Sequence, residues 1–205
     1  MSVVGGSANT GLVARVQNIL MKPAAEWDVI DGEPATVGSL FTGYACILAA
    51  IPAVATLIQY TLFLHNPIVG VVAAVLGYVV SLVAVFIMAL IIDALAPSFG
   101  AQKNQVQALK LTVYSYTASW VAGILNIVPV LGILAALAGL YGLYIMYLGL
   151  PKLMKSPPDK TVGYFVVSIV VAIVVNVVIS MIVAAVIGAM LFSAAATGAA
   201  AFGAH

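Results

Sequence analysis

Long, uninterrupted runs of apolar residues dominate the chain from residue 36 onward. A helix needs roughly 20 residues to cross a hydrocarbon core of ~30 Å, and five runs reach that length: residues 36–64, 67–95, 106–128, 129–150 and 162–192. Helices are expected, because an open sheet edge cannot be satisfied in lipid and a barrel would show short alternating segments instead. The pattern therefore predicts an all-α membrane protein built as a bundle of five transmembrane helices.

The polar interruptions divide the chain into three parts. Residues 1–35 precede the first run, residues 36–192 form the five-span domain, and residues 193–205 form a tail of small residues. Two joins are short, at residues 65–67 and 126–129, and Pro129 can begin the returning helix because a first-turn N–H needs no helical partner. The first 11 residues are small and polar, with no apolar core after a basic start, so no signal peptide is expected.

A short amphipathic helix is predicted ahead of the first span. One face is apolar and the other is basic and polar; the two sets are Leu12, Val16, Ile19 and Leu20, and Arg15, Asn18 and Lys22. We expect this helix to lie along the lipid headgroups with its basic face outward, and Trp27 and Ile30 to rest against the membrane. The acidic cluster that follows is either a solvated connector or a docking patch for a partner: Glu26, Asp28, Asp31 and Glu33.

Composition supports a membrane protein and narrows its function. Hydrophobic residues make up 64% of the chain and charged residues 6%, whereas a soluble domain is about a quarter charged. This excludes most soluble enzymes and nucleic-acid binders. One cysteine and two histidines leave no internal disulfide and little material for a metal site. No Ser-His-Asp set, Gly-rich phosphate loop or Cys/His ligand spacing is present, so we expect neither an enzyme nor a cofactor.

The basic residues predict an orientation. With five spans, all seven Lys and Arg residues fall on one side of the membrane, which the positive-inside rule assigns to the cytoplasm. The N-terminus is then cytoplasmic and the C-terminus outside. Three of these residues, Lys152, Lys155 and Lys160, occupy a proline-rich loop, where they either set the topology or contact lipid headgroups or a partner.

Several segments together resemble a known family. They are residues 22–30 (KPAAEWDVI), 93–104 (DALAPSFGAQKN), 113–120 (VYSYTASW), 144–155 (YIMYLGLPKLMK) and 159–164 (DKTVGY). Their order and spacing resemble the bacterial branch of the Ypt-interacting protein (Yip) family. The resemblance implies five spans and a cytoplasmic N-terminus, and for the bacterial branch it implies no established biochemical activity.

Eukaryotic members of this family are similar to the chain in the spans and are linked to Rab GTPases and early secretory membranes. They usually carry a long cytosolic N-terminal region with an acidic-aromatic motif. Only residues 1–35 precede the first predicted span here, and they give no good match to that motif. A GTPase partner is therefore doubtful, and the resemblance favours a protein of the bacterial inner membrane.

Four residues form a candidate intramembrane polar site. Asp93 and Lys110 are the charged residues expected within span ends, where they can pair across adjacent helices. They are either a snorkelling, partly hydrated structural pair or part of a functional site, because an intramembrane carboxylate is a functional candidate. Tyr116 and Tyr144 map to the cytoplasmic half of the spans. A cytoplasm-facing polar cavity lined by Asp93, Tyr116 and Tyr144 is one hypothesis.

A row of small or polar residues recurs every four positions along the fifth predicted span: Ser168, Ala172, Asn176, Ser180, Ala184 and Gly188. Such rows let membrane helices approach closely and share hydrogen bonds. The row can serve packing within the chain, or part of it can contact a second subunit.

These patterns favour a non-enzymatic integral membrane protein of the Yip family type, which organises membranes or membrane-protein complexes by helix packing and cytoplasmic-loop contacts. Its expected partners are the lipid bilayer and either other membrane proteins or a second copy, with no nucleic acid. Two alternatives stay open: a transporter or lipid-handling protein with the polar cavity, and an accessory subunit of a larger membrane complex. The five spans show no internal repeat of the kind common in transporters.

Overall fold

The computed structural model describes the backbone of residues 11–202 and the side chains of residues 11–189. Within this part the chain is helical and contains no strand. The helices are α1 (Leu12–Met21), α2 (Pro23–Gly32), α3 (Val37–Leu40), α4 (Cys46–Leu62), α5 (Pro67–Leu95), α6 (Gln105–Ser115), α7 (Thr117–Ala122), α8 (Gly132–Leu153) and α9 (Pro158–Phe202). Shorter helical turns join them: a π-turn η1 (Phe41–Ala45), and the 3₁₀ turns η2 (Ala96–Phe99), η3 (Gly123–Ile127) and η4 (Pro129–Leu131).

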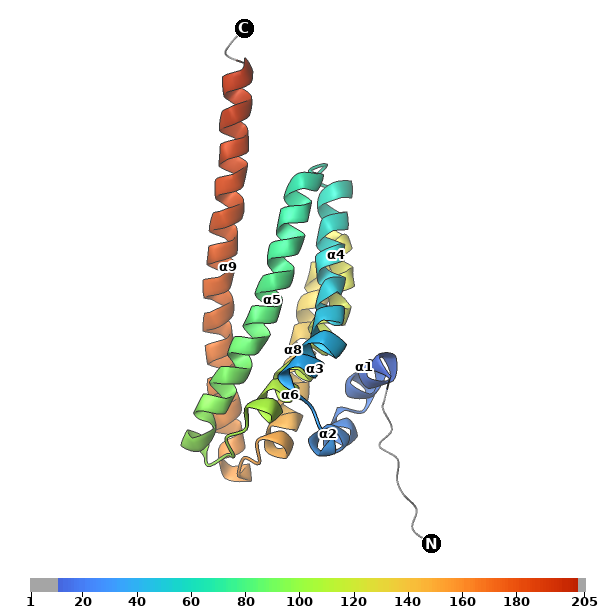
Figure 1. Ribbon diagram of the computed structural model, residues 1–205, viewed down its shortest axis with the longest axis vertical. Coiled ribbons are helices and arrows are strands. Elements are labelled where there is room, and N and C mark those ends of the chain that lie inside the picture. The colour runs from blue at the N-terminus through green and yellow to red at the C-terminus, as the bar shows by residue number, and fades with distance from the viewer. Residues whose placement is uncertain (1–10, 203–205) are drawn as a thin grey trace.

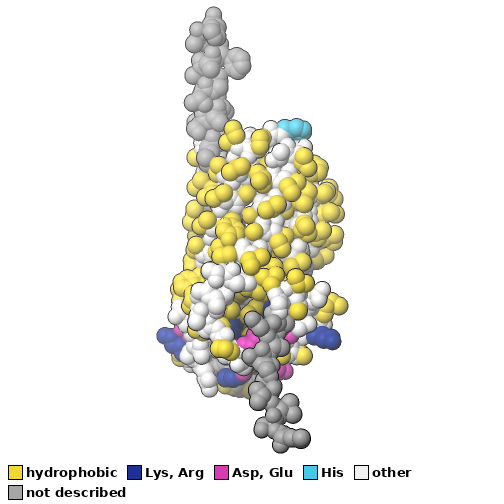
Figure 2. Space-filling view, turned by 45° about the vertical axis from the view of Figure 1, so that its right-hand side comes forward, with side chains coloured by type: hydrophobic (Ala, Val, Ile, Leu, Met, Phe, Trp, Pro, Cys, Tyr) yellow, Lys and Arg dark blue, Asp and Glu magenta, His cyan; other side chains and the backbone are white. Residues whose placement is uncertain are grey.

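Four helical stretches of the described chain are long and apolar enough to cross a membrane: Val37–Leu62, Pro67–Phe99, Pro129–Leu153 and Pro158–Ala189. They coincide with the first, second, fourth and fifth predicted spans. Figure 1 shows these helices running lengthwise, with α1 and α2 set across one end of the bundle and the α4–α5 turn at the other. Figure 2 shows hydrophobic side chains along most of that length and acidic and basic side chains gathered at the α1–α2 end. The prediction of a helical membrane protein is confirmed.

The third predicted span is not one unbroken helix. Residues 105–127 are divided among α6, α7 and η3, which hold 11, 6 and 5 residues, with an interruption at Tyr116. Close backbone approaches fix the path of this segment. A Cβ on Gly123 would lie 2.7 Å from the Pro52 Cβ of α4, and a Cβ on Gly142 of α8 would lie 2.8 Å from the Ser115 carbonyl oxygen. The segment is therefore packed between two neighbours where its geometry departs from a regular helix.

Both predicted short joins are present. In the α4–α5 turn His65 has φ +52°, the Asn66 side chain accepts a hydrogen bond from the Val69 N–H at 3.2 Å, and Pro67 begins α5. Pro129 likewise begins the returning stretch that continues into α8. At the far end of the chain α9 continues past the predicted limit at residue 192 to Phe202. The alanine-rich sequence there explains the extension, because alanine has the highest helix propensity.

The buried core lies toward the α1–α2 end. Its largest fully buried side chains include Trp27 and Ile30 of α2, Leu111 of α6, and Ile145 and Leu150 of α8. The Trp27 indole N–H donates to the Ile145 carbonyl oxygen at 2.9 Å. The expectation that Trp27 and Ile30 rest against the membrane is therefore wrong: α2 buries them in the protein. Farther from this end the helices present their apolar side chains outward, and none of the most hydrophobic stretch of α9 is buried.

Candidate functional site

Helices α1 and α2 form a folded layer at the charged end of the bundle. We call residues 12–33 the polar cap. Only Lys22 separates the end of α1 at Met21 from Pro23, which begins α2, and the two helices pack against each other. The apolar face of α1 turns inward, with Ile19 fully buried and Leu12, Val16 and Leu20 packed against the core. The apolar face of α1 thus packs against protein rather than against lipid alone.

Arg15 occupies the centre of the polar cap. It is 5% exposed and forms salt bridges with Glu26 and Glu33, and its guanidinium lies 5.7 Å from the centroid of the Tyr114 ring. Burial alone lowers the pKa of Arg15, but the hydrogen bond to Glu33 and the negative charges of Glu33 and Glu26 outweigh burial and raise it. The prediction that Arg15 points outward to the headgroups is wrong, because two carboxylates draw it inward.

Lys110 of α6 binds the end of α2 rather than Asp93. Its ammonium donates to the Ile30 carbonyl oxygen at 2.9 Å and to the Glu33 carbonyl oxygen. Carbonyls at a helix C-terminus lack helical partners and carry partial negative charge, which favours a cation there. Asp93 is buried, and its Oδ1 has no hydrogen-bond partner among the described residues. The hypothesis of an Asp93–Lys110 pair is wrong.

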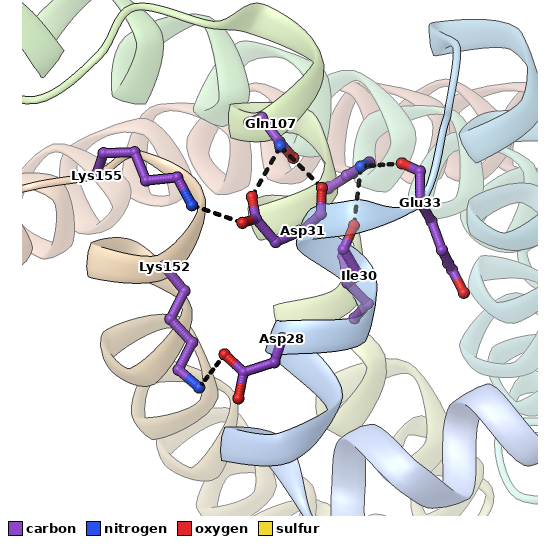
Figure 3. Close-up of polar contacts among 8 residues, drawn as sticks. Asp28, Ile30, Asp31, Glu33, Gln107, Lys152 and Lys155 are labelled. Atoms are coloured by element: carbon purple, nitrogen blue, oxygen red, sulfur yellow. Dashed lines mark hydrogen bonds and ion pairs between the residues drawn. The ribbon is translucent and has the colours of Figure 1, made fainter. Parts of the chain in front are cut away.

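Two lysines, one in the last turn of α8 and one just after it, form salt bridges with the outer side of α2. Lys152 forms a salt bridge with Asp28, and Lys155 forms one with Asp31 (Figure 3). The Gln107 side chain of α6 donates to the same Asp31 carboxylate at 3.0 Å. The acidic cluster therefore holds the polar cap on α6 and α8, a role beyond the two alternatives considered from sequence. Lys160 forms none of the salt bridges of the described residues and lies beside Gly100.

The candidate tyrosines do not surround one cavity with Asp93. Tyr144 is 51% exposed and packs against the ring of Tyr141. Tyr116 lies elsewhere, on a groove that neither Asp93 nor Tyr144 lines. The predicted cavity of Asp93, Tyr116 and Tyr144 is therefore not assembled. A different tyrosine, Tyr44 in η1, shares a hydrogen bond of 2.8 Å with the Thr117 hydroxyl and ties the first span to α7.

The predicted row of small and polar residues on α9 is buried at one end and exposed at the other. Ser168 is fully buried and Ala172 half-buried, whereas Asn176, Ser180, Ala184 and Gly188 are exposed. The Asn176 amide donates to the Ala172 carbonyl of its own helix at 2.8 Å. Four members of the row line the groove on which Tyr116 lies, between α8 and α9, with a volume of ≈ 1010 Å³: Ala172, Asn176, Ser180 and Ala184. Ser168 and Ala172, at the end of the row nearest the polar cap, are thus the members that the rest of the described chain covers most.

The sequence reasoning missed the partners that assemble the polar cap. Arg15, Glu26 and Glu33 are distant in sequence, and no short motif links them. The sequence contains one signal for these salt bridges. A basic residue on a short helix precedes a proline that starts a second helix, and this second helix is rich in acidic residues. Ser115 is a further polar residue that the candidate polar site does not include. It is buried, lines the groove between α8 and α9, and its hydroxyl has no partner among the described residues.

Comparison with known proteins identifies one family. The family model described as Yip1 domain matches residues 18–180, from the middle of α1 to the middle of α9. No curated protein and no solved structure matches the chain. The matched range contains the groove residues of α8 and α9 up to Ser180 and the ion-pair partners of the cap except Arg15.

Proposed function

This chain belongs to the Yip1 domain family, and from that premise we propose that it is a non-enzymatic protein of the bacterial inner membrane which organises membrane-protein complexes. It does so by presenting the polar cap to a partner while its helices hold it in the bilayer. The ionisable side chains of the cap support this role, because they bind one another and so keep a rigid surface in place. An accessory subunit of a larger complex is one form that such a protein takes.

The observation that carries the proposal is a set of exposed apolar side chains on the polar cap. Val13 and Met21 project from α1 and Val29 from α2, and all three side chains are exposed, Met21 to 79%. The salt bridges of Arg15 with Glu26 and Glu33 hold α1 against α2, and the exposed apolar side chains lie on these two helices. Exposed apolar side chains that gather in one patch rimmed by polar residues are typical of interaction sites.

We also propose five membrane crossings, with the broken segment of residues 105–127 as the third. Its 23 residues give a helical length of about 34 Å, enough for a ~30 Å core. One end supplies Lys110 to the polar cap, and the other places Ile124 and Ile127 beside Ile58, near the end of α4. Irregular backbone within a membrane is tolerated where protein covers it, and Thr117, Ala118 and Trp120 around the interruption are buried. With five crossings the polar cap is cytoplasmic and the C-terminus lies outside.

Site-specific photo-crosslinking in cells tests the proposed function. A photoreactive residue at Met21 or Val29 is expected to yield a crosslinked species of defined mass, identified by mass spectrometry. The matched control carries the same residue at Ile68, which is 78% exposed at the opposite end of the bundle, and should not yield that species. Substitution of Val13 by Glu should abolish the crosslink from Met21 while the chain stays folded. Equal products from all three positions, or no product from the cap, would contradict the proposal.

A further inference from the structure

Helices α5 and α9 are in contact near the charged end of the bundle and separate farther along. At the charged end the Tyr164 hydroxyl donates to the Ile92 carbonyl oxygen, and the Tyr164 ring stacks on Phe99. Nearer the α4–α5 turn a recess of ≈ 460 Å³ lies between the two helices. Gly77 lines this recess, and no atom of another described helix lies within 4 Å of its Cβ position. Figure 1 shows α5 leaning away from α9 in this direction.

Small and polar residues face each other across this recess. Because α5 ends and α9 begins at the charged end, equal numbers of residues counted from their contact there reach about the same level. Ser81 and Asn176 lie 11 and 12 residues from that contact, along α5 and α9 respectively. Gly77 and Ser180 lie 15 and 16 residues from it. All four line the recess, and small residues at matching levels let two membrane helices approach closely.

Ser81 and Asn176 have complementary hydrogen-bonding groups. The Ser81 hydroxyl accepts a hydrogen bond from the Trp120 indole N–H at 3.0 Å, which leaves its own proton for another acceptor. The Asn176 amide N–H donates to the Ala172 carbonyl of its own helix, and its side-chain oxygen is an acceptor. Asn176 is exposed within a membrane-spanning stretch, where hydrocarbon supplies no hydrogen bond. A bond from Ser81 to Asn176 would satisfy both groups.

We propose that α9 moves between the open position of this structure and a closed position, in which Ser81 donates to Asn176 and Gly77 packs against Ser180. The movement pivots about the base of α9, where Ser168 is fully buried. Asn176 and Ser180 also line the groove toward α8, so closing the recess on the α5 side widens the groove on the α8 side. This conformational device goes beyond the proposed function, since the polar cap takes no part in it.

The membrane keeps the two positions close in free energy. Lipid tails are as apolar as the helices, so closing gains van der Waals packing and a polar contact but no hydrophobic driving force. In the open position lipid chains fill the recess and replace much of that packing. Both positions are therefore populated, and a change in a single recess residue shifts the ratio between them.

Disulfide trapping tests the closed position. The full chain carries Cys46→Ala, Gly77→Cys and Ser180→Cys in vesicles of phosphatidylethanolamine and phosphatidylglycerol, and an oxidant is added. A disulfide needs Cβ atoms about 3.8 Å apart, closer than any atom of another described helix lies to the Cβ position of Gly77, so its formation reports closing. The control has Ile182→Cys in place of Ser180→Cys. Ile182 lies at nearly the same level but is 59% exposed and lines neither recess, so we expect a disulfide in the first chain and none in the control.

Distances between two spin labels measure both populations. Labels on Val75→Cys and Ile182→Cys, which replace exposed residues, should give two distances in the same background without the native cysteine. Gly77→Leu should leave only the longer distance, because its bulk separates the backbones. Asn176→Ala should lower the ratio of closed to open about threefold, as for the loss of one polar contact between membrane helices. Val71→Leu is the control and should change nothing, since Val71 is exposed and lines neither recess.

Any one of four results would overturn the proposal. A single long distance without a disulfide would show that α9 stays apart from α5, and a single short distance would show that no open position exists. Equal disulfide yields from Ser180→Cys and Ile182→Cys would show that the walls of the recess do not determine the contact. A ratio left unchanged by both Gly77→Leu and Asn176→Ala would contradict the roles of these residues in closing.

Discussion

Arg15 is the residue of the polar cap whose substitution should destabilise the protein most, because its charge is buried. The guanidinium has left water and depends on Glu26 and Glu33 for compensation. The salt bridge of Lys152 with Asp28 joins the polar cap to α8 and is open to solvent. Removing one partner of a buried pair leaves the other charge unpaired, whereas an exposed pair contributes little. Loss of the buried salt bridge should therefore lower the free energy of unfolding much more than loss of the exposed one.

Arg15→Ala is expected to lower the free energy of unfolding by about 3–5 kcal/mol. Lys152→Ala, the matched exposed control, should lower it by less than about 1 kcal/mol. Thermal unfolding in a mild detergent, followed by Trp fluorescence, measures both, because Trp27 belongs to the cap and is fully buried. The double variant Arg15→Met/Glu26→Gln should recover part of the loss. Equal effects of Arg15→Ala and Lys152→Ala would show that the buried network does not hold the cap.

Gly149 permits the close approach of α2 to α8. A Cβ there would lie 2.5 Å from the Trp27 Cε2 and 2.7 Å from the Leu111 Cδ1, so Gly149→Ala should destabilise the protein by roughly 1–3 kcal/mol through overpacking. Gly77→Ala is the control, because nothing lies within 4 Å of its Cβ position and alanine favours helix. The same unfolding assay compares them. A neutral Gly149→Ala would mean that α2 does not dock on α8 as described.

Whole helices were more predictable than the contacts between them. Apolar run length and the prolines at residues 67 and 129 located four long helices and two turns, since bilayer thickness and missing N–H groups constrain them directly. The interruption at Tyr116 could not be predicted, because the packing beside it involves residues that are distant in sequence, such as Gly142 against the Ser115 carbonyl. For the same reason the sequence suggests Asp93 as a partner of Lys110, whereas the end of α2 at Ile30 and Glu33 binds it.

The role of Lys110 at the end of α2 predicts independence from Asp93. Lys110→Ala should loosen the polar cap and expose residues 12–33 to protease, since the Ile30 and Glu33 carbonyls lose their donor. Asp93→Ala acts elsewhere, so the two changes should add within about 0.5 kcal/mol in the double variant. Unfolding of the two single variants and the double variant gives the coupling. A double variant more stable than either single would restore the direct pair.

The molecule as a whole combines an apolar bundle with a charged cap at one end. Charged side chains gather around α1 and α2, and the α4–α5 turn lies at the other end (Figures 1 and 2). This asymmetry supports insertion in one orientation with the basic residues in the cytoplasm. The number of crossings then decides where the C-terminus lies, and that number depends on the broken segment of residues 105–127.

Reporter fusions after His205 measure this directly, with a fusion at Met1 as the reference. If the broken segment crosses the membrane, a fluorescent protein after His205 should stay dark and alkaline phosphatase at the same place should be active, while a fluorescent protein at Met1 should glow. A bright C-terminal fusion on an intact chain would contradict five crossings, because it would place both ends of the protein in the cytoplasm.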